Sequence, residues 1–272
     1  MEKILLYYKF TPVADPEMTR EWQRELCLRH GLRGRIIVAG QGINGTVGGP
    51  VDGLKAYIKA MNQSRDFKKI EYKWSAGGAE DFPRLSVKVR RELVTLAPDE
   101  SFDVFAPTKA LSPEKWHAYL QAHPDVTLLD ARNDYESAIG VFRGPNLVTP
   151  PIQNFREIKE VVDQLPRDKP ILTYCTGDIR CEYLSAYMRH KGFAEVYHLN
   201  GGIVKYGERY GDGGYWDGKC FVFDKRMALA FSPDAKDIGT CSLCGQPTSR
   251  YVNDDQAGDS RLVLVCGRCA EQ

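Results

Sequence analysis

The sequence predicts a mixed α/β protein of three parts, and three observations carry that prediction. Over residues 1–95, apolar patterns follow one another in the order strand, helix, strand, strand, helix, strand. Over residues 110–212, strands alternate with helices, which is typical of a parallel sheet. Over residues 213–272, four of the eight cysteines form two Cys-x-x-Cys pairs. A chain of 272 residues is long enough for two modest domains.

The first part is expected to fold as an α+β sandwich. Its first helix begins at Asp15-Pro16, because Asp caps a helix and Pro is favoured at the first helical position, and Gly31 ends it. The order of elements is that of a ferredoxin-like sandwich. The predicted strands are 4–10, 35–39, 43–47, 70–74 and 85–89, and the predicted helices are 16–30 and 51–61.

The first part is also basic. Residues 1–95 hold 17 Lys and Arg against 11 Asp and Glu, a net charge of +6, whereas residues 96–272 hold 20 against 25, a net charge of −5. A basic domain can bind an acidic partner such as RNA, and solvated surface charge explains the same excess equally well. Tyr72 and Trp74 alternate with lysines, so they can stack on bases or line a domain interface.

The second part follows a predicted linker at residues 96–109, where two prolines and several acids leave little core. Ser112-Pro113-Glu114 then starts a helix, with Ser as the N-cap and Pro at the first position. In a parallel sheet, reactive groups lie at the carboxyl ends of strands, which is where Asp130 and Cys175 fall. The further predicted strands are 126–129, 171–174 and 196–199, the helices are 158–165 and 182–191, and residues 206–217 are predicted to be a loop.

A six-residue loop after strand 171–174 is the strongest candidate for chemistry. A free thiol with a pKa of about 8.5 is mostly protonated at neutral pH. Inward-pointing backbone amides, the dipole of the next helix, the flexibility of Gly177 and the charge of Arg180 would favour the thiolate. Cysteine phosphatases use a longer Cys-x5-Arg loop, so Cys-x4-Arg better fits a sulfur atom bound to cysteine, and an inert buried cysteine is the alternative. The loop consists of Cys175, Thr176, Gly177, Asp178, Ile179 and Arg180.

Segments elsewhere in the chain match the surroundings of this loop in rhodanese domains. Residues 130–132, 140–144 and 199–203 resemble the accompanying rhodanese elements and occur in the same order. Beyond that, the chain resembles the rhodanese-domain tRNA uridine hydroxylases in the segments Gly42-Ile43-Asn44-Gly45-Thr46, 130–136, 175–182, 201–206 and 220–226. The resemblance runs from Tyr7 to about Arg226, and the cysteine-rich end is similar in kind but shorter than in that family.

The resemblance implies that molecular oxygen is used to install 5-hydroxyuridine at the wobble position of certain tRNAs. It implies that Cys175 is the essential cysteine, that Arg180 and the loop amides support it, and that Asp130 and Arg132 order the site. Cys181, directly after the loop, can be a resolving thiol or simply pack against the sheet. The basic first part is then the tRNA-binding surface, with Lys68, Lys69, Lys73, Arg84, Lys88, Arg90 and Arg91 as candidates.

Two positions depart from the family pattern. The family loop usually reads Cys-Thr-Gly-Gly-Ile-Arg, so Asp178 replaces its second glycine. An inward-pointing Asp178 would raise the pKa of the Cys175 thiol, whereas an outward-pointing one would not. Gln41 stands where an acidic residue usually precedes Gly42.

The cofactor and partner predictions follow from what the sequence contains. It holds no flavin or nicotinamide fingerprint and no two-His-one-carboxylate iron pattern, so no flavin, nicotinamide or haem is expected. Addition of a cysteine to C6 of uracil would make C5 electron-rich and open to oxygen. The alternative is a sulfurtransferase that passes persulfide sulfur from Cys175 to an acceptor. We expect tRNA as partner, no DNA and no membrane, and a cytoplasmic location, because the N-terminus does not resemble a signal peptide.

The two cysteine pairs at the end predict a metal site. Twenty-one residues separate Cys241-x-x-Cys244 from Cys266-x-x-Cys269, a spacing typical of a zinc ribbon. Gly245 and Gly267 suit the tight turns of such a site. The predicted role is structural, with zinc pinning a small module, and disulfides or free thiols are the alternatives.

Overall fold

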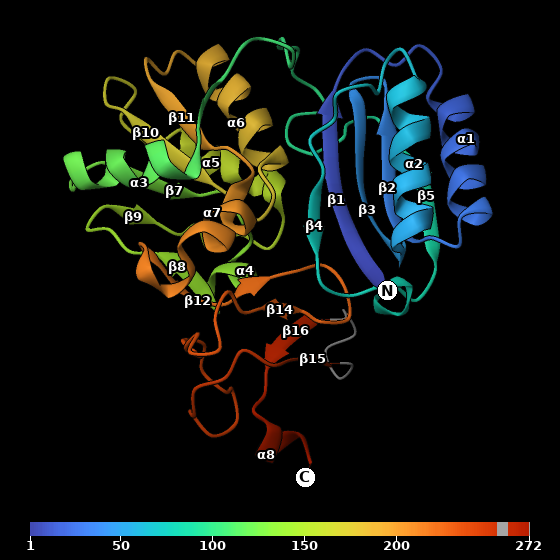
Figure 1. Cartoon of the computed structure of the whole chain (residues 1–272). Helices are drawn as coiled ribbons and strands as arrows, with labels where there is room; N and C mark the ends of the chain where they lie inside the picture. The colour runs from blue at the N-terminus through green and yellow to red at the C-terminus, as the bar shows by residue number, and fades with distance from the viewer. Residues whose placement is uncertain (255–260, 272) are drawn as a thin grey trace. The chain divides into compact units, whose positions relative to one another are not determined.

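The computed structural model describes residues 1–254 and 261–271, which form two compact units, Met1–Ala106 and Pro107 to the C-terminus. In Figure 1 the first unit is coloured blue to green and the second green to red. The mixed α/β class is confirmed, because one five-stranded sheet belongs to each unit. Within the described residues, no helix is both long and apolar enough to cross a membrane.

The first unit is a five-stranded sheet with the strand order β4-β1-β3-β2-β5. The first four strands have the order expected of a ferredoxin-like sandwich, and β5 adds a further edge by pairing parallel to β2. β1 pairs antiparallel with β3 and with β4. The elements are β1 (Glu2–Phe10), α1 (Pro16–Arg29), β2 (Arg33–Ala39), β3 (Gly42–Pro50), α2 (Val51–Gln63), β4 (Lys73–Ser75), the 3-10 turn Ala79–Asp81 and β5 (Leu85–Val89).

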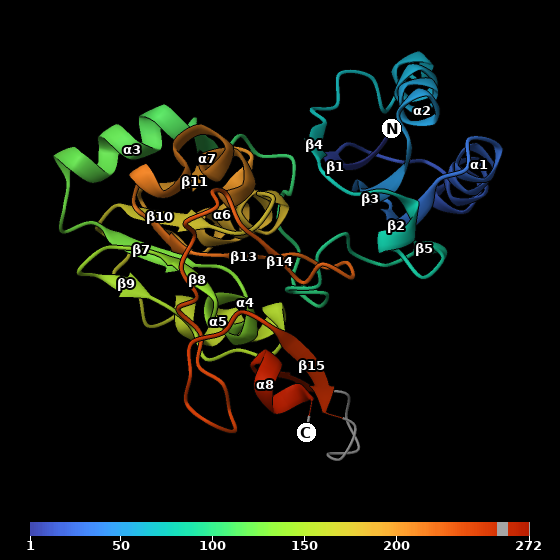
Figure 2. The same cartoon turned by 60° about the horizontal axis from the view of Figure 1, so that its bottom comes forward.

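Both helices of the first unit cover the same face of its sheet (Figures 1 and 2). Leu26 of α1 and Leu54 of α2 are buried in one apolar cluster with Ile36 and Val38 of β2. The predicted cap of α1 is present, since the Asp15 carboxylate accepts a hydrogen bond from the Met18 amide at 2.9 Å. Side chains alternate along a strand, so the neighbours of these core residues point to the sheet face that no helix covers.

The predicted linker carries more core than we expected. Leu96, Ala97 and Val104 are buried, and the compact unit extends to Ala106. The Leu93 amide donates to the side-chain oxygen of Gln41 at 3.3 Å. The prolines and acids that suggested an open linker therefore flank a short apolar segment that packs into the first unit. The composition alone did not reveal this packing.

The second unit is built on a parallel sheet with the strand order β6-β11-β10-β7-β9. Two short strands, β8 and β12, pair antiparallel beside it. The elements up to residue 213 are β6 (Lys109–Leu111), α3 (Pro113–Ala122), β7 (Thr127–Asp130), α4 (Asp134–Ser137), β8 (Gly140–Phe142), β9 (Leu147–Val148), the 3-10 turn Phe155–Glu157, α5 (Ile158–Val162), β10 (Ile171–Tyr174), α6 (Ile179–His190), β11 (Val196–Leu199), α7 (Gly202–Tyr210) and the 3-10 turn Gly211–Gly213.

Several helical boundaries differ from the prediction, and α5 ends at Val162, three residues before the predicted end. α6 begins at Ile179, three residues before the predicted start, so Arg180 and Cys181 lie in its first turn. α7 extends to Tyr210 into a segment predicted to be a loop. Gly and Tyr in that segment weaken the helical pattern, but Tyr206 is fully buried against the sheet, and this packing holds the helix.

The two faces of the second sheet have different covers (Figure 2). Leu172 and Tyr174 of β10 pack in one cluster with Trp116 of α3 and Ile203 of α7. Thr173 points the other way and contacts Cys181 of α6, with 3.6 Å between its hydroxyl and the sulfur. The reactive loop thus lies between the end of a buried strand and a helix on the face opposite α3.

The C-terminal part folds onto the second unit as short strands and a hairpin. Tyr251 packs with Ile139 and Phe221 in a small apolar cluster. The short strand Cys220–Phe221 pairs antiparallel with Ala228–Leu229. The elements are β12 (Trp216–Gly218), β13 (Cys220–Phe221), β14 (Ala228–Leu229), β15 (Tyr251–Asp254), β16 (Arg261–Leu264) and α8 (Gly267–Ala270).

Candidate active site

Cys175 lies immediately after β10 and is 1% exposed. The Asp178 amide donates to its sulfur at 3.2 Å, and the Cys181 amide donates to the Asp178 carbonyl at 2.8 Å. Burial by itself raises the pKa of the Cys175 thiol. The hydrogen bonds from Cys181 and the charge of Arg180 outweigh burial and lower the pKa to about 6. The loop therefore holds Cys175 as a thiolate at neutral pH, whereas the pKa of Cys181 is raised and its thiol stays protonated.

Glu136 of α4 holds the arginine of the loop in place. The Arg180 guanidinium donates to both carboxylate oxygens of Glu136, at 2.5 and 2.7 Å, and the Thr176 hydroxyl donates to the same carboxylate at 3.2 Å. Glu136 is fully buried, so this pair is shielded from water. Arg180 consequently acts on Cys175 as a fixed positive charge near the sulfur.

Asp130 and Arg132 form a second buried pair that supports α4. The Arg132 guanidinium donates to the two carboxylate oxygens of Asp130 at 2.8 and 2.6 Å, and both side chains are fully buried. The same guanidinium donates to the carbonyls of Glu136 and Gly140, at 3.1 and 2.6 Å. The two residues predicted to order the site thus reach the loop through the backbone of Glu136.

Asp178 points inward and is paired there. Its carboxylate lies 2.6 Å from Nδ1 of His198 and accepts from the Gly201 amide at 3.1 Å. Its charge acts to raise the pKa of Cys175, as predicted for an inward carboxylate, but the opposing interactions prevail. Burial lowers the pKa of His198, and the charge of Asp178 more than offsets this, so the pKa is raised. The Asp178 carboxylate and the His198 ring therefore balance each other's charge beside the Cys175 loop.

The backbone at position 178 has a conformation that suits the glycine expected from the family resemblance. Asp178 has a φ of +87°, in the left-handed region that non-glycine residues rarely adopt. Such a residue costs on the order of 1 kcal/mol or more, and it persists only when its surroundings fix it. The hydrogen bonds to His198 and Gly201 provide that fixation.

The start of α7 closes the loop from the other side. The Ile203 and Val204 amides donate to the carbonyls of Cys175 and Thr176, at 2.9 and 3.2 Å. A Cβ on Gly202 would lie only 2.6 Å from those same carbonyl oxygens, so only glycine permits this approach. The segment 199–203, which resembles a rhodanese element, therefore packs directly against the Cys175 loop.

Sequence reasoning missed Glu136 and His198 as parts of the site. His198 lies in no metal-binding spacing that would single it out, yet it is 2% exposed and pairs with Asp178. Its place at the end of β11, the strand next to β10, was a usable signal, since carboxyl ends of neighbouring parallel strands converge. Glu136 could not be found this way, because its reach depends on the turn after β7.

The four cysteines of the tail converge. The sulfur atoms of Cys241, Cys244, Cys266 and Cys269 all lie within 4.8 Å of one another. Four thiolates around zinc with Zn–S bonds of about 2.3 Å have sulfurs about 3.8 Å apart, so this arrangement fits a tetrahedral ion. Gly245 has a φ of +73° directly after the first pair, as the predicted tight turn requires. These residues can bind a metal.

The basic candidates of the first unit divide into three groups. Arg84, Lys88 and Arg90 line a groove of about 390 Å³ together with Arg35, which we had not predicted. Lys68 and Lys69 are exposed elsewhere, and Arg91 is exposed near Asp99. Lys73 is 3% exposed with its Nζ over the ring of Tyr8, so it does not belong to the surface. Tyr72 packs against the core, which excludes it as an exposed stacking residue.

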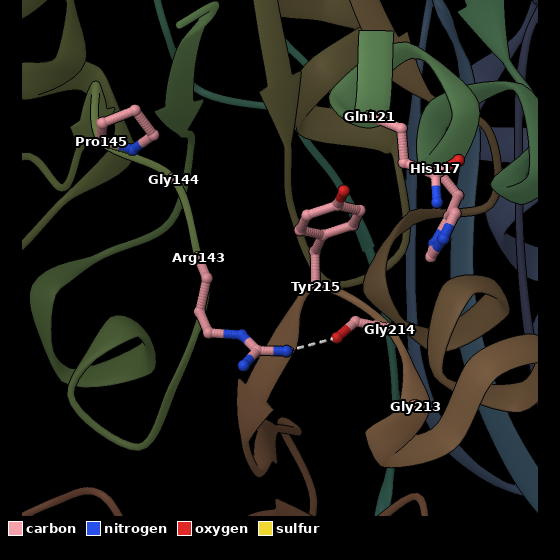
Figure 3. Close-up of a pocket in the computed structure, with 8 residues that line it drawn as sticks. All are labelled: His117, Gln121, Arg143, Gly144, Pro145, Gly213, Gly214 and Tyr215. Atoms are coloured by element: carbon pink, nitrogen blue, oxygen red, sulfur yellow. Dashed lines mark hydrogen bonds between the residues drawn. The ribbon is translucent and has the colours of Figure 1, made fainter. Parts of the chain in front are cut away.

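A second pocket, of about 630 Å³, opens on the second unit at the far end of α7 from the reactive loop (Figure 3). The Arg143 guanidinium crosses it to donate to the Gly214 carbonyl at 2.6 Å. His117 stacks on Tyr210 with 4.3 Å between the ring centres, and its Nδ1 hydrogen-bonds to the Tyr206 hydroxyl. The wall of this pocket thus combines the Arg143 guanidinium with the aromatic rings of His117 and Tyr215.

Three family models match the chain in succession: the UPF0176 acylphosphatase like domain over residues 2–93, the Rhodanese-like domain over 112–209 and the Rhodanase C-terminal over 217–272. The tRNA uridine(34) hydroxylase of Rhodococcus jostii is 47% identical over 99% of this chain and 97% of its own length. The chain belongs to the tRNA uridine(34) hydroxylase family. Family members from Corynebacterium glutamicum and an Arthrobacter species are 46% and 45% identical, over 98% and 99% of this chain and 88% and 95% of theirs.

Membership in this family extends to the tail that we had judged the weaker part of the resemblance. The matched region includes residues 217–272 and thus both cysteine pairs. The family's rhodanese model ends at residue 209, and the first unit falls within its acylphosphatase-like model. The resemblance predicted from the motifs is confirmed over nearly the whole chain.

Proposed function

We propose that this protein hydroxylates uridine 34 of tRNA to 5-hydroxyuridine with molecular oxygen, using Cys175 as the nucleophile. The observation that carries the proposal is the buried Cys175 sulfur, which accepts from the Asp178 amide and whose pKa is lowered by Arg180, itself fixed by Glu136. Relatives that match the full length of the chain bear the name of this activity. As part of the same proposal, the protein works in the cytoplasm, where its tRNA substrate is found.

The chemistry begins with the addition of the Cys175 sulfur to C6 of uracil. The sulfur uses its lone pair to form the C6–S bond, and the electrons of the C5=C6 bond move onto C5. C5 then forms a bond to dioxygen. Because Cys175 is 1% exposed, the wobble base must leave the anticodon stack and displace the groups that cover the sulfur.

Mass analysis of tRNA nucleosides tests this function against sulfur transfer. Purified protein, unmodified tRNA, oxygen and an added thiol should yield 5-hydroxyuridine, and Cys175→Ala should yield none. The product should also vanish under nitrogen. Formation of thiolated uridine, or full hydroxylation by Cys175→Ala, would overturn the proposal and in the first case favour the sulfurtransferase.

We propose the cationic groove of the first unit as a tRNA contact. Arg35, Lys88 and Arg90 lie on the sheet face that α1 and α2 leave uncovered, where their charges can meet successive phosphates. Lys88→Ala and Arg90→Ala should each weaken tRNA binding several-fold, and each should reduce the slope of log affinity against log salt by roughly 0.7–0.9. Lys59→Ala, on the exposed side of α2, is the matched control. An unchanged slope in both groove variants would exclude this surface.

We further propose that the four tail cysteines hold a structural zinc ion. All four ligand positions are sulfur, which leaves no open position for catalysis. Elemental analysis of purified protein should find one zinc per chain, and Cys244→Ser should remove it. A zinc-free, fully folded protein would contradict the assignment.

A further inference from the structure

We propose that Cys181 is the second catalytic thiol of the hydroxylation and that it ends each turnover in a disulfide with Cys175. The inference rests on the proposed function and supplies what that function lacks, a source of two electrons. Sequence reasoning left Cys181 between a resolving thiol and a packing residue. The geometry around the loop favours the first.

The peptide of Asp178 links the two cysteines. Its amide donates to the Cys175 sulfur at 3.2 Å, and its carbonyl accepts from the amide of Cys181 at 2.8 Å. Cys181 lies in the first turn of α6 directly after the loop, and its fully buried sulfur has the Thr173 hydroxyl at 3.6 Å. The two thiols are neighbours that shift each other's pKa, so both sulfurs belong to one buried site.

The electron count of the reaction requires such a partner. Hydroxylation puts one atom of dioxygen on C5 and leaves the other to become water, which takes up two electrons. Two thiols that join in a disulfide release two electrons and two protons. The sum of uracil, dioxygen and two thiols is therefore 5-hydroxyuracil, one disulfide and water, with every atom accounted for.

The first steps assign a role to each sulfur. The Cys175 thiolate adds to C6, and the electron pair that arrives at C5 forms the bond to dioxygen, giving a peroxide anion on C5. The Cys181 thiol gives its proton to that anion. The resulting Cys181 thiolate attacks the outer oxygen, so that the O–O bond breaks, the inner oxygen keeps the electron pair, and Cys181 becomes a sulfenic acid.

The last steps release the product. The oxygen on C5 takes a proton from water and the C5 hydrogen leaves to water as a proton, so the C5=C6 bond re-forms and Cys175 departs with the C6–S electron pair. The freed thiolate attacks the sulfenic sulfur of Cys181 and expels hydroxide, which becomes water. An external thiol then reduces the disulfide for the next turnover.

The electrostatics of the pair suit this order of events. In the resting site, Cys181 is protonated because of its burial and because it faces the Cys175 thiolate and the Asp178 carboxylate. Once Cys175 has bonded to C6 it carries no charge, so one of the causes that keep Cys181 protonated disappears. The proton is thus held until the peroxide has formed.

A single-turnover experiment tests the inference. Fully reduced protein, freed of small thiols, is mixed with excess unmodified tRNA in oxygenated buffer. We expect no more than one 5-hydroxyuridine per chain, an equal amount of Cys175–Cys181 disulfide by peptide mass mapping, and continued turnover only after dithiothreitol is added. Several products per chain without added thiol, or product without disulfide, would overturn the inference.

Variants separate the role of Cys181 from a structural one. Cys181→Ser keeps a hydrogen-bond donor beside Cys175, so alkylation of Cys175 by iodoacetamide should persist, while single-turnover product should fall at least tenfold and recover in part with excess dithiothreitol. Cys220→Ser changes another buried cysteine of the same unit and should still give one product per chain. Wild-type yield from Cys181→Ser without added thiol would contradict the inference.

The same assay distinguishes the two proposals. If the wild-type protein makes no 5-hydroxyuridine even with oxygen and excess dithiothreitol, the proposed function fails and the role of Cys181 fails with it. If it makes the product but the Cys175–Cys181 disulfide never accompanies it, the function stands and only the role of Cys181 is wrong.

Discussion

The reactive loop and the cysteine-rich tail use sulfur in opposite ways. In the loop, a single thiolate at Cys175 is surrounded by amides, a thiol and a fixed arginine. In the tail, four sulfurs within 4.8 Å face one another, and backbone amides such as that of Cys266 reach the Cys241 sulfur at 3.3 Å. The first arrangement stabilises one negative charge within the protein. The second gathers four sulfurs that, once ionised, need a cation between them.

The difference shows that sequence spacing alone does not define what a cysteine does. Five residues separate Cys175 from Cys181, and one end of a buried strand and one end of a helix enclose both. The tail pairs are each two residues apart and are brought together by the hairpin of β15 and β16. Strand ends favour reactivity, whereas a closed set of four favours structure.

The largest effect expected from this comparison is that hydroxylation activity and zinc content can be removed independently of each other. Cys175→Ala should lower hydroxylation by about 1,000-fold or more while zinc content is unchanged, because the nucleophile is lost and the tail is not touched. Cys241→Ala should lose the zinc and keep the alkylation rate of Cys175. Nucleoside mass analysis, elemental analysis and iodoacetamide labelling measure the three quantities. A large fall in Cys175 labelling in Cys241→Ala would show that the two regions are coupled.

The next largest effect concerns the support of the loop arginine. Glu136→Gln removes one partner of a buried ion pair, which typically costs about 3–5 kcal/mol, and leaves Arg180 without its anchor. We expect a lower unfolding midpoint in urea and slower alkylation of Cys175. Glu114→Gln is the matched control, because Glu114 pairs with Arg209 on the surface, where such pairs contribute only about 0–1 kcal/mol. Equal effects of the two variants would argue against the role of Glu136.

The pH dependence of the loop follows from the lowered pKa of Cys175. Alkylation of Cys175 should reach half its maximal rate near pH 6, whereas an unfolded thiol does so near its ordinary pKa of about 8.5. Because the folded pKa lies below the unfolded one, the stability contributed by the thiolate is fully present above about pH 8.5 and is lost as the pH falls through about 6. Urea unfolding of wild type and Cys175→Ala between pH 5 and 9 should diverge with rising pH. Parallel curves would rule out a stabilised thiolate.

The smallest expected effect concerns Asp178, which stands where the family loop is expected to carry glycine. Asp178→Gly removes a carboxylate that raises the pKa of Cys175 and relieves a left-handed φ of +87°, so the alkylation midpoint should move below that of wild type. The pKa of His198 should fall in the same variant, since its anionic partner is gone. Lys69→Gly relieves a similar φ of +62° in the other unit and should leave the alkylation midpoint unchanged. A rise of the midpoint in Asp178→Gly would contradict this account.

Much of the fold could be predicted because the signals were local. Strand 85–89 was predicted with its observed bounds, and α3 begins where Ser112-Pro113 indicated. The Cys175 loop and the cysteine spacing were equally clear, because both are short and their residue types are specific. Predictions weakened where packing overrides composition, as in the buried segment around Leu96 and in the last turns of α7.

The sequence by itself determined the class of fold, the six-residue Cys175 loop and the two Cys-x-x-Cys pairs, since each depends on neighbours along the chain. Only the tertiary structure decided the direction of Asp178, its pairing with His198, the anchoring of Arg180 by Glu136 and the burial of Lys73. The two pairings join residues that are 20 and 44 positions apart in the sequence. The direction of Asp178 and the burial of Lys73 depend on the side chains that pack around them. In a parallel sheet, such residues meet because the carboxyl ends of separate strands share one edge, and no local pattern records that meeting.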